Sequence, residues 1–131
     1  MLLDTSGLLC YFAVTDAHHG DAVTYFNSAR KRLTHSYVLA EFVPLCQTRG
    51  LPRTASLSFA VDLLNNPHVE IVWIGQDMHE AALALLQARL DKTYSLCDAA
   101  SFLLMRQYGT GDALTTDRHL EQEGFARLLR P

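Results

Sequence analysis

Short apolar runs alternate along the chain with longer stretches in which apolar residues recur at helical spacing. The apolar runs predict short strands at residues 1–3, 33–35, 69–74, 112–116 and 125–129. The stretches between them predict helices at residues 8–12, 21–31, 36–49, 51–64, 77–86, 98–108 and 118–123. Strands separated by helices predict a doubly wound parallel α/β sheet of about four to five strands with helices on both faces.

Several details of this pattern are specific enough to check. Asp77 followed by Glu80 predicts a capping box at the start of the most regular helix. Gly50 is expected to end the helix at 36–49, and Pro44 to kink that helix or shift its start. Residues 69–74 are predicted to form a central strand, with Trp73 in the core.

Composition limits the possible classes of protein. With 131 residues, 49% of them hydrophobic, residues 1–131 fit one domain that folds without disulfides or a structural metal. We expect a cytoplasmic protein, because Asp4 interrupts the N-terminal apolar run and no stretch is long enough to cross a membrane. The net charge of −3 argues weakly against a nucleic-acid binder, yet a nuclease that gathers carboxylates around metal ions is also acidic.

The cysteines and the adjacent histidines suggest no chemistry from spacing alone. Cys10, Cys46 and Cys97 are far apart and lie in apolar runs, so we interpret them as buried thiols in a reducing compartment, with a zinc site as the alternative. His18 and His19 lie in a polar stretch without a partner at metal-binding spacing, and are expected in a solvated turn.

Four acidic residues carry the candidate chemistry. Asp4 and Asp117 directly follow predicted strands, and ligands of parallel sheets bind beyond the carboxyl ends of the strands. Glu41 and Asp98 lie near the starts of helices that can point toward the same edge. Carboxylates brought together in this way suit Mg²⁺ or Mn²⁺, which would activate a water for hydrolysis of a phosphodiester.

Each of these acids also has a purely structural interpretation. Asp4 and Asp117 can cap the helices that follow them. Asp98, three residues after Ser95, fits the acidic position of a capping box. Glu41 can simply occupy the exposed flank of an apolar helix.

Four sequence blocks resemble PIN domains, in an order similar to that of the toxin ribonucleases of bacterial VapBC toxin–antitoxin modules. The blocks are residues 1–6, 40–41, 95–100 and 114–120, and the resemblance spans essentially the whole chain. It implies a PIN-like fold and a Mg²⁺- or Mn²⁺-dependent endoribonuclease that leaves a 5′-phosphate and a 3′-hydroxyl. It also implies a homodimer and a small VapB-like antitoxin, for which the helices at 21–31 and 54–64 are expected to form a groove.

The resemblance assigns roles to individual residues. Asp4, Asp98 and Asp117 match the metal-binding aspartates, and Glu41 matches the acid that binds metal directly or through water. Hydroxyl residues that flank the site are implied to position carboxylates or phosphate; they are Thr5, Ser6, Thr115 and Thr116.

Three neighbouring residues complete this picture. Arg118 and Lys92 are the cations best placed to meet RNA phosphates. Some members carry another acid at the position of His119, so tight binding of a second ion is not expected here.

Two other functions compete with this prediction. A phosphatase of the haloacid dehalogenase type also begins with an aspartate after its first strand, but it needs an acid at the position of Ser6. A catalytically inactive PIN-like binding module is the second alternative, and the presence of all four acids argues against it.

Overall fold

The computed structural model describes residues 1–131 as a five-stranded parallel sheet in the order β3-β2-β1-β4-β5. The strands are β1 (Leu2–Leu3), β2 (Arg32–His35), β3 (Val69–Val72), β4 (Asp112–Leu114) and β5 (Ala126–Arg127). The helices are α1 (Thr5–Phe12), α2 (His19–Ser28), α3 (Ser36–Thr48), α4 (Arg53–Asn65), α5 (Gln76–Gln87), α6 (Leu96–Tyr108) and α7 (Arg118–Gln122). The predicted α/β class, parallel sheet and order of elements are confirmed.

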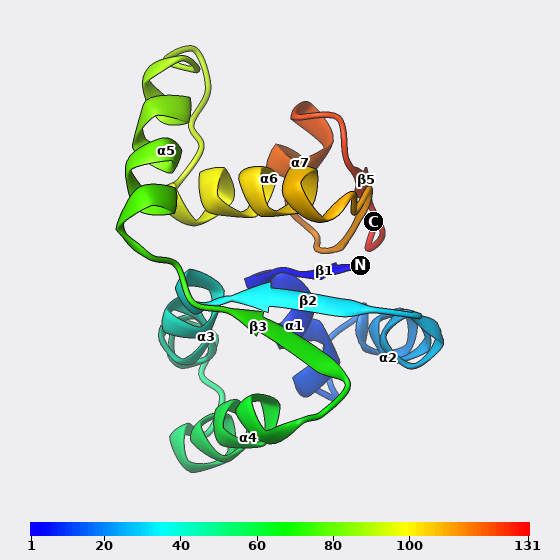
Figure 1. Ribbon diagram of the computed structural model, residues 1–131. Helices are drawn as coiled ribbons and strands as arrows, with labels where there is room; N and C mark the ends of the chain where they lie inside the picture. The colour runs from blue at the N-terminus through cyan, green and yellow to red at the C-terminus, as the bar shows by residue number, and fades with distance from the viewer.

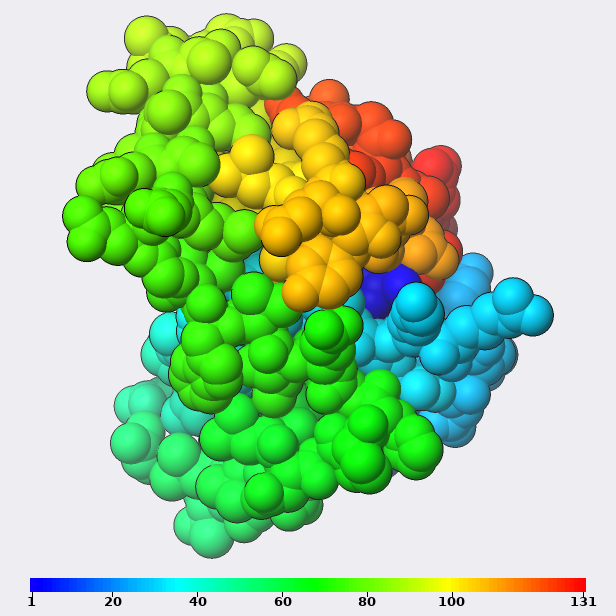
Figure 2. All heavy atoms as spheres, viewed as in Figure 1, coloured from blue at the N-terminus to red at the C-terminus, as the bar shows by residue number.

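The helices form two layers, one on each face of the sheet. Helices α1 to α4 cover one face, and α5 to α7 cover the other (Figure 1). The central strand β1 contains only two residues, and both of its neighbours are parallel to it. In the space-filling view, later segments of the chain cover almost all of the dark blue N-terminal segment (Figure 2).

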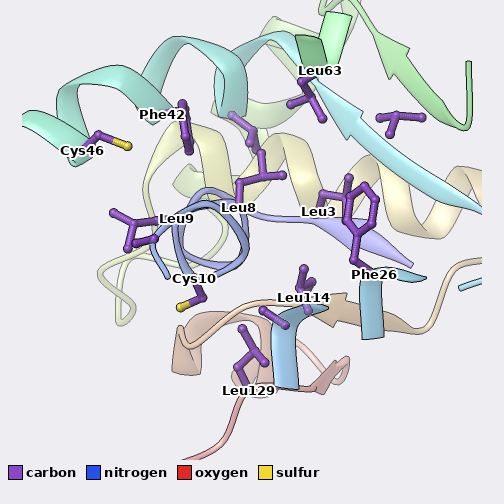
Figure 3. Packing of buried hydrophobic residues seen from close by; sticks show 14 of the residues in the cluster. Leu3, Leu8, Leu9, Cys10, Phe26, Phe42, Cys46, Leu63, Leu114 and Leu129 are labelled. Carbon is purple, nitrogen blue, oxygen red and sulfur yellow. The ribbon is translucent and has the colours of Figure 1, made fainter. Parts of the chain in front are cut away.

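Alternation of side chains along the short strands separates two hydrophobic clusters. Leu3 and Leu114 belong to the larger cluster, which packs with α1 to α4 and is drawn in Figure 3. Leu2 and Ala113, one residue earlier in each strand, belong to the smaller cluster beneath α5 to α7. Successive residues of a strand point to opposite faces, so two fully buried leucines in β1 join both clusters.

Helix α1 packs against β4 at a distance that only glycine permits. A Cβ atom on Gly7 would lie 1.8 Å from the carbonyl oxygen of Leu114. This close contact fixes the first turn of α1 against the carboxyl end of β4, which is the edge where the predicted acids lie.

Some sequence predictions are wrong in detail. β3 is an edge strand rather than a central one, and Trp73 is 67% exposed because it lies one residue beyond the end of that strand. The Asp77–Glu80 capping box does not form: Gly75 is the N-cap of α5, and the Glu80 carboxylate accepts from Gln76 instead.

Two other details are confirmed, the glycine after α3 and the burial of the cysteines. Gly50 follows α3 with a φ of 72°, as predicted for the residue that ends this helix. Pro44 lies inside α3 and does not shift its start, which stays at Ser36; the predicted kink stays a prediction. All three cysteines are free and buried. None of the helices has the length and apolar character needed to span a membrane.

Candidate active site

Asp4 directly follows β1, and its side chain is only 5% exposed. As the N-cap residue of α1 it makes no side-chain capping bond, so the capping interpretation of this residue is wrong. Its Oδ2 instead accepts a hydrogen bond of 2.7 Å from the hydroxyl of Thr115. A buried carboxylate that is not needed for the helix start is available for other chemistry.

The Thr115 hydroxyl links Asp4 to the next acid along the sheet edge. Its single proton goes to Asp4, so it can only accept from the Asp117 backbone N–H at 2.9 Å and from the Ser6 hydroxyl at 3.1 Å. Ser6 Oγ in turn accepts from the backbone N–H of Thr116 at 3.0 Å. This chain of bonds fixes the loop after β4 against the first turn of α1.

Asp98 and Asp117 are helix-capping residues and line the candidate site as well. Asp98 forms a capping box with Ser95 at the start of α6, and Asp117 accepts from the His119 backbone N–H at the start of α7. Both protein hydrogen bonds to the Asp98 carboxylate go to Oδ2, which leaves Oδ1 without a protein donor. A carboxylate has two oxygens, so the structural and chemical interpretations are compatible.

His119 also belongs to the site, although its sequence position alone gave it no role there. Its Nδ1 lies 2.8 Å from Asp98 Oδ2 and 3.5 Å from Asp117 Oδ1. Ligand atoms of Asp98, Asp117 and His119 all lie within 4.8 Å of one another. A carboxylate only accepts, so Nδ1 donates to Asp98, and His119 positions this acid rather than binding an ion itself. Its position two residues after Asp117 was the available signal, because some members of the family that the sequence resembles carry an acid there.

Glu41 reaches the site from α3. Its side chain is exposed, and Oε2 accepts a hydrogen bond of 3.3 Å from the Thr5 hydroxyl. This hydrogen bond comes from the residue after Asp4, so it holds the Glu41 carboxylate near the first turn of α1.

All four predicted acids line a single cleft of about 590 Å³ at the carboxyl edge of the sheet. The lining also includes Thr5, Ser6, Ser95 and His119. Arg49, at the end of α3, is the one arginine or lysine side chain in the lining. Thr115 is buried beneath the cleft, and Thr116 lines a smaller neighbouring cavity. Lys92 and Arg118 are exposed and do not line the cleft, and Lys92 lies 3.5 Å from Asp91.

The electrostatics of the cleft disfavour extra negative charge. Burial raises the pKa of Asp4 to about 6, the Thr115 hydrogen bond opposes this shift, and the neighbouring carboxylates of Asp98 and Asp117 add to it. Burial and the carboxylates of Asp4 and Glu41 also raise the pKa of the Cys97 thiol. Cys97 therefore stays protonated and does not act as a nucleophile.

Comparison with known proteins identifies the family. The chain is 30% identical to the 23S rRNA-specific endonuclease VapC20 of Mycobacterium tuberculosis over 129 residues, which are 98% of this chain and 97% of that protein. It is 31% identical to ribonuclease VapC26 of the same species over 119 residues, which are 90% and 87% of the two chains. No protein-family model matches the chain.

The fold agrees with these relatives. The crystal structure of Mycobacterium tuberculosis VapC20, described as a sarcin–ricin loop cleaving toxin, matches with a TM-score of 0.87 and 30% identity. The match covers 99% of this chain and 98% of the other. A parallel sheet in the order 3-2-1-4-5, layered by seven helices, thus defines a PIN-type fold. The chain belongs to the VapC family of PIN-domain ribonuclease toxins.

Proposed function

We propose that this chain, residues 1–131 as a single PIN domain, is an endoribonuclease that requires Mg²⁺ or Mn²⁺. One observation carries the proposal: Asp4, Glu41, Asp98 and Asp117 come from four distant segments and line the same cleft. Four carboxylates gathered in one place repel one another unless a cation lies between them. No positively charged side chain forms an ion pair with Asp4, and the only one with Asp98 or Asp117 is His119, when protonated.

The donor atoms fit a hard divalent cation. Asp4, Asp98 and Asp117 supply carboxylate oxygens, and Asp98 Oδ1 has no protein donor that would compete with an ion. The raised pKa of Asp4 supports the same assignment, because a bound cation would stabilise the carboxylate that burial destabilises. Arg49, also in the lining, is not paired with any of these acids and is available to an RNA phosphate.

Hydrolysis in this cleft divides into roles for the chain's own side chains. A bound ion would stabilise the developing negative charge and would lower the pKa of the attacking water. Glu41, held by Thr5, orients that water and accepts its proton. The water oxygen bonds to phosphorus, the bond from phosphorus to the 3′ oxygen breaks, and that oxygen takes up a proton. Thr115 holds Asp4 in place, and His119 does the same for Asp98.

The substrate we propose is ribosomal RNA. VapC20 is a 23S rRNA-specific endonuclease, and this chain matches it over nearly its whole length in sequence and in structure. Arg49 is the candidate to bind a phosphate within the cleft, in place of the Lys92 and Arg118 that the sequence suggested.

The proposal includes a VapB-like antitoxin and a homodimer. An apolar cavity of about 450 Å³ lies between α1, α2 and α4. Its lining includes Val23 and Phe26 from α2 and Phe59 and Leu63 from α4, which are segments that the sequence analysis assigned to an antitoxin groove.

Cleavage of purified ribosomes tests the function. Wild-type protein with Mn²⁺ should cut 23S rRNA at one position, mapped by primer extension, and should leave a 5′-phosphate. Asp98→Asn should lower the rate at least about 100-fold, and Glu41→Gln should lower kcat by about 10²- to 10⁴-fold. Glu70→Gln, an exposed residue of β3, is the matched control and should leave the rate unchanged.

Two outcomes would reject the proposal in different ways. If calorimetry shows no binding of Mn²⁺ to the wild-type protein, the alternative of a catalytically inactive PIN-like binding module is favoured. Hydrolysis of a small phosphate monoester in preference to RNA would favour a phosphatase. That mechanism needs an acid at the position of Ser6, whose hydroxyl here bonds to the Thr115 hydroxyl and the Thr116 backbone N–H.

A further inference from the structure

A second group of metal-ligating side chains lies outside the acidic cleft. It consists of Cys10 from α1, Asp16 from the loop that follows α1, and His18, the N-cap residue of α2. Their ligand atoms all lie within 4.8 Å of one another, and His18 Nδ1 is 3.6 Å from Asp16 Oδ1. This trio combines a sulfur, an oxygen and a nitrogen donor, unlike the sulfur-free set of the acidic cleft.

Hydrogen bonds hold the loop against α1 in this arrangement. The backbone N–H of His18 donates to Asp16 Oδ1 at 2.8 Å, and the backbone N–H of Asp16 donates to the Ala13 carbonyl at 2.9 Å. His19 Nδ1 lies 2.9 Å from the carbonyl oxygen of Cys10, to which it donates. His19 therefore supports the backbone of the trio, while His18 contributes its ring to it.

The three residues line one small cavity. It has a volume of about 280 Å³, and its lining includes all three ligands together with Ser6 and Arg49. The side chains of Asp16 and His18 are 19% and 27% exposed, so a hydrated ion can reach them from solvent. Figure 3 shows the Cys10 sulfur at the margin of the large hydrophobic cluster, directed away from Leu8.

We propose that Cys10, Asp16 and His18 form a binding site for a borderline-soft divalent metal such as Zn²⁺, with water as the fourth ligand. In tetrahedral zinc sites with metal–ligand bonds of about 2.0–2.3 Å, neighbouring ligand atoms lie roughly 3.3–3.7 Å apart. The separation between His18 and Asp16 already falls in that range, and the Cys10 sulfur needs a displacement of about 1 Å at most. Three protein ligands and one water are the coordination of zinc sites that keep an open position, in contrast to structural sites with four protein ligands.

Metal binding here replaces one proton. Burial, hydrogen bonding to Asp16 and the charge of Asp16 together raise the pKa of the Cys10 thiol to about 12, although the charge of Arg49 opposes the shift. The free protein thus carries a thiol, and binding converts it to a metal thiolate while one proton leaves to solvent. The ion would also connect α1 to the α1–α2 loop, directly behind Ser6, which lines both cavities.

Cobalt spectroscopy tests this site independently of the proposed nuclease activity. Co²⁺ bound by a thiolate gives an intense near-ultraviolet charge-transfer band, which an ion in the acidic cleft does not give. Titration of the metal-free Asp98→Asn/Asp117→Asn protein with Co²⁺ should produce this band with one equivalent, and one equivalent of Zn²⁺ should remove it. Cys10→Ser should abolish the band, whereas Cys97→Ser, the cysteine beside the acidic cleft, should retain it.

Substitution of an exposed ligand keeps the test valid if Cys10→Ser fails to fold. His18→Gln should weaken Co²⁺ binding at least tenfold, and His68→Gln, an exposed histidine whose side chain makes no hydrogen bond, should leave it unchanged. The proposal is overturned if the starting protein shows no thiolate band. It is equally overturned if the band survives Cys10→Ser, or if His18→Gln and His68→Gln bind Co²⁺ alike.

Discussion

His119 Nδ1 lies 2.8 Å from Oδ2 of Asp98. The imidazole ring of His119, in α7, therefore orients the carboxylate of Asp98 in the first turn of α6. A carboxylate only accepts, so Nδ1 carries the proton, and the Thr93 hydroxyl at 3.1 Å can then donate to Nε2. Asp98 is thus held from two sides, by Ser95 and by His119. Partners of this kind tune the metal affinity of the carboxylates that they hold.

Loss of the His119 ring should weaken metal binding rather than folding. We expect His119→Ala to raise the Kd for Mn²⁺ about 10- to 100-fold, measured by calorimetry, with a parallel loss of ribonuclease activity. His119→Asn, which retains a donor near Nδ1, should recover part of the affinity. Equal Mn²⁺ affinities in wild type and His119→Ala would show that this hydrogen bond does not support the site.

Asp4→Asn should stabilise the protein while inactivating it. The pKa of Asp4 in the folded chain is about 6 instead of 3.8, so its ionisation opposes folding above about pH 6 and has no effect below about pH 3.8. At pH 7 without divalent ions, the substitution should raise the free energy of unfolding by up to about 3 kcal/mol. Urea denaturation at pH 7 and pH 4 measures this, and a gain of the same size at both values would contradict it.

Mn²⁺ provides the complementary measurement. The ion should raise the Tm of wild type, because it compensates the buried negative charge, and should have a much smaller effect on Asp4→Asn. An equal increase in both proteins would place the ion away from Asp4.

His35 should make the fold sensitive to acid. Its ring is fully buried, accepts from the Tyr37 backbone N–H and contacts Ser101 Oγ at 2.8 Å, and burial lowers its pKa from 6.5 to about 4. Above about pH 6.5 the ring is neutral in the folded and the unfolded chain and has no effect on stability. As the pH falls from 6.5 to about 4, only the unfolded chain takes up the proton, so the free energy of unfolding decreases by about 3 kcal/mol.

Asp4 and His35 titrate in overlapping pH ranges and change the free energy of unfolding in opposite directions, so the experiment must separate their effects. Unfolding measured between pH 4 and 7 on the Asp4→Asn background isolates His35, and stability should fall as the pH decreases. Adding His35→Gln should flatten the profile, even though the variant is less stable throughout. A profile that keeps its slope would assign the acid sensitivity to another group.

Gly7→Ala should be strongly destabilising, against the usual preference of helices for alanine. The added Cβ would lie 1.8 Å from the Leu114 carbonyl oxygen, and the backbone must shift to relieve this contact. We expect a loss of about 3 kcal/mol or more in thermal or urea unfolding. Gly20→Ala in α2 meets nothing within 4 Å and should be neutral or stabilising by up to about 1 kcal/mol.

The sequence predicted the elements well because hydrophobic periodicity is a local property. It did not predict the order of the strands, since β3 is as apolar as an interior strand and yet lies at the edge of the sheet. Trp73 was misplaced for the same reason, because its exposure depends on where the strand ends and on which helices cover it.

The candidate site was predicted more fully than its supporting contacts. The residues after β1 and β4 share an edge in any parallel sheet, so Asp4 and Asp117 could be paired from strand positions alone. The bond from Thr115 to Asp4 spans 111 residues, and the trio around Cys10 forms only when the α1–α2 loop folds back onto α1. Such contacts have no fixed sequence spacing, so His18 could not be distinguished from a solvated histidine.

The two leucines of β1 tie the cleft to the whole interior. Asp4 follows them directly, and its backbone N–H bonds to the Leu114 carbonyl at 3.2 Å between the two hydrophobic clusters. We expect this amide to exchange with solvent mainly through global unfolding, because strands in the interior of a sheet open last. Asp4 therefore follows directly on the part of the fold that we expect to unfold last. This side of the cleft is already formed before a ligand binds.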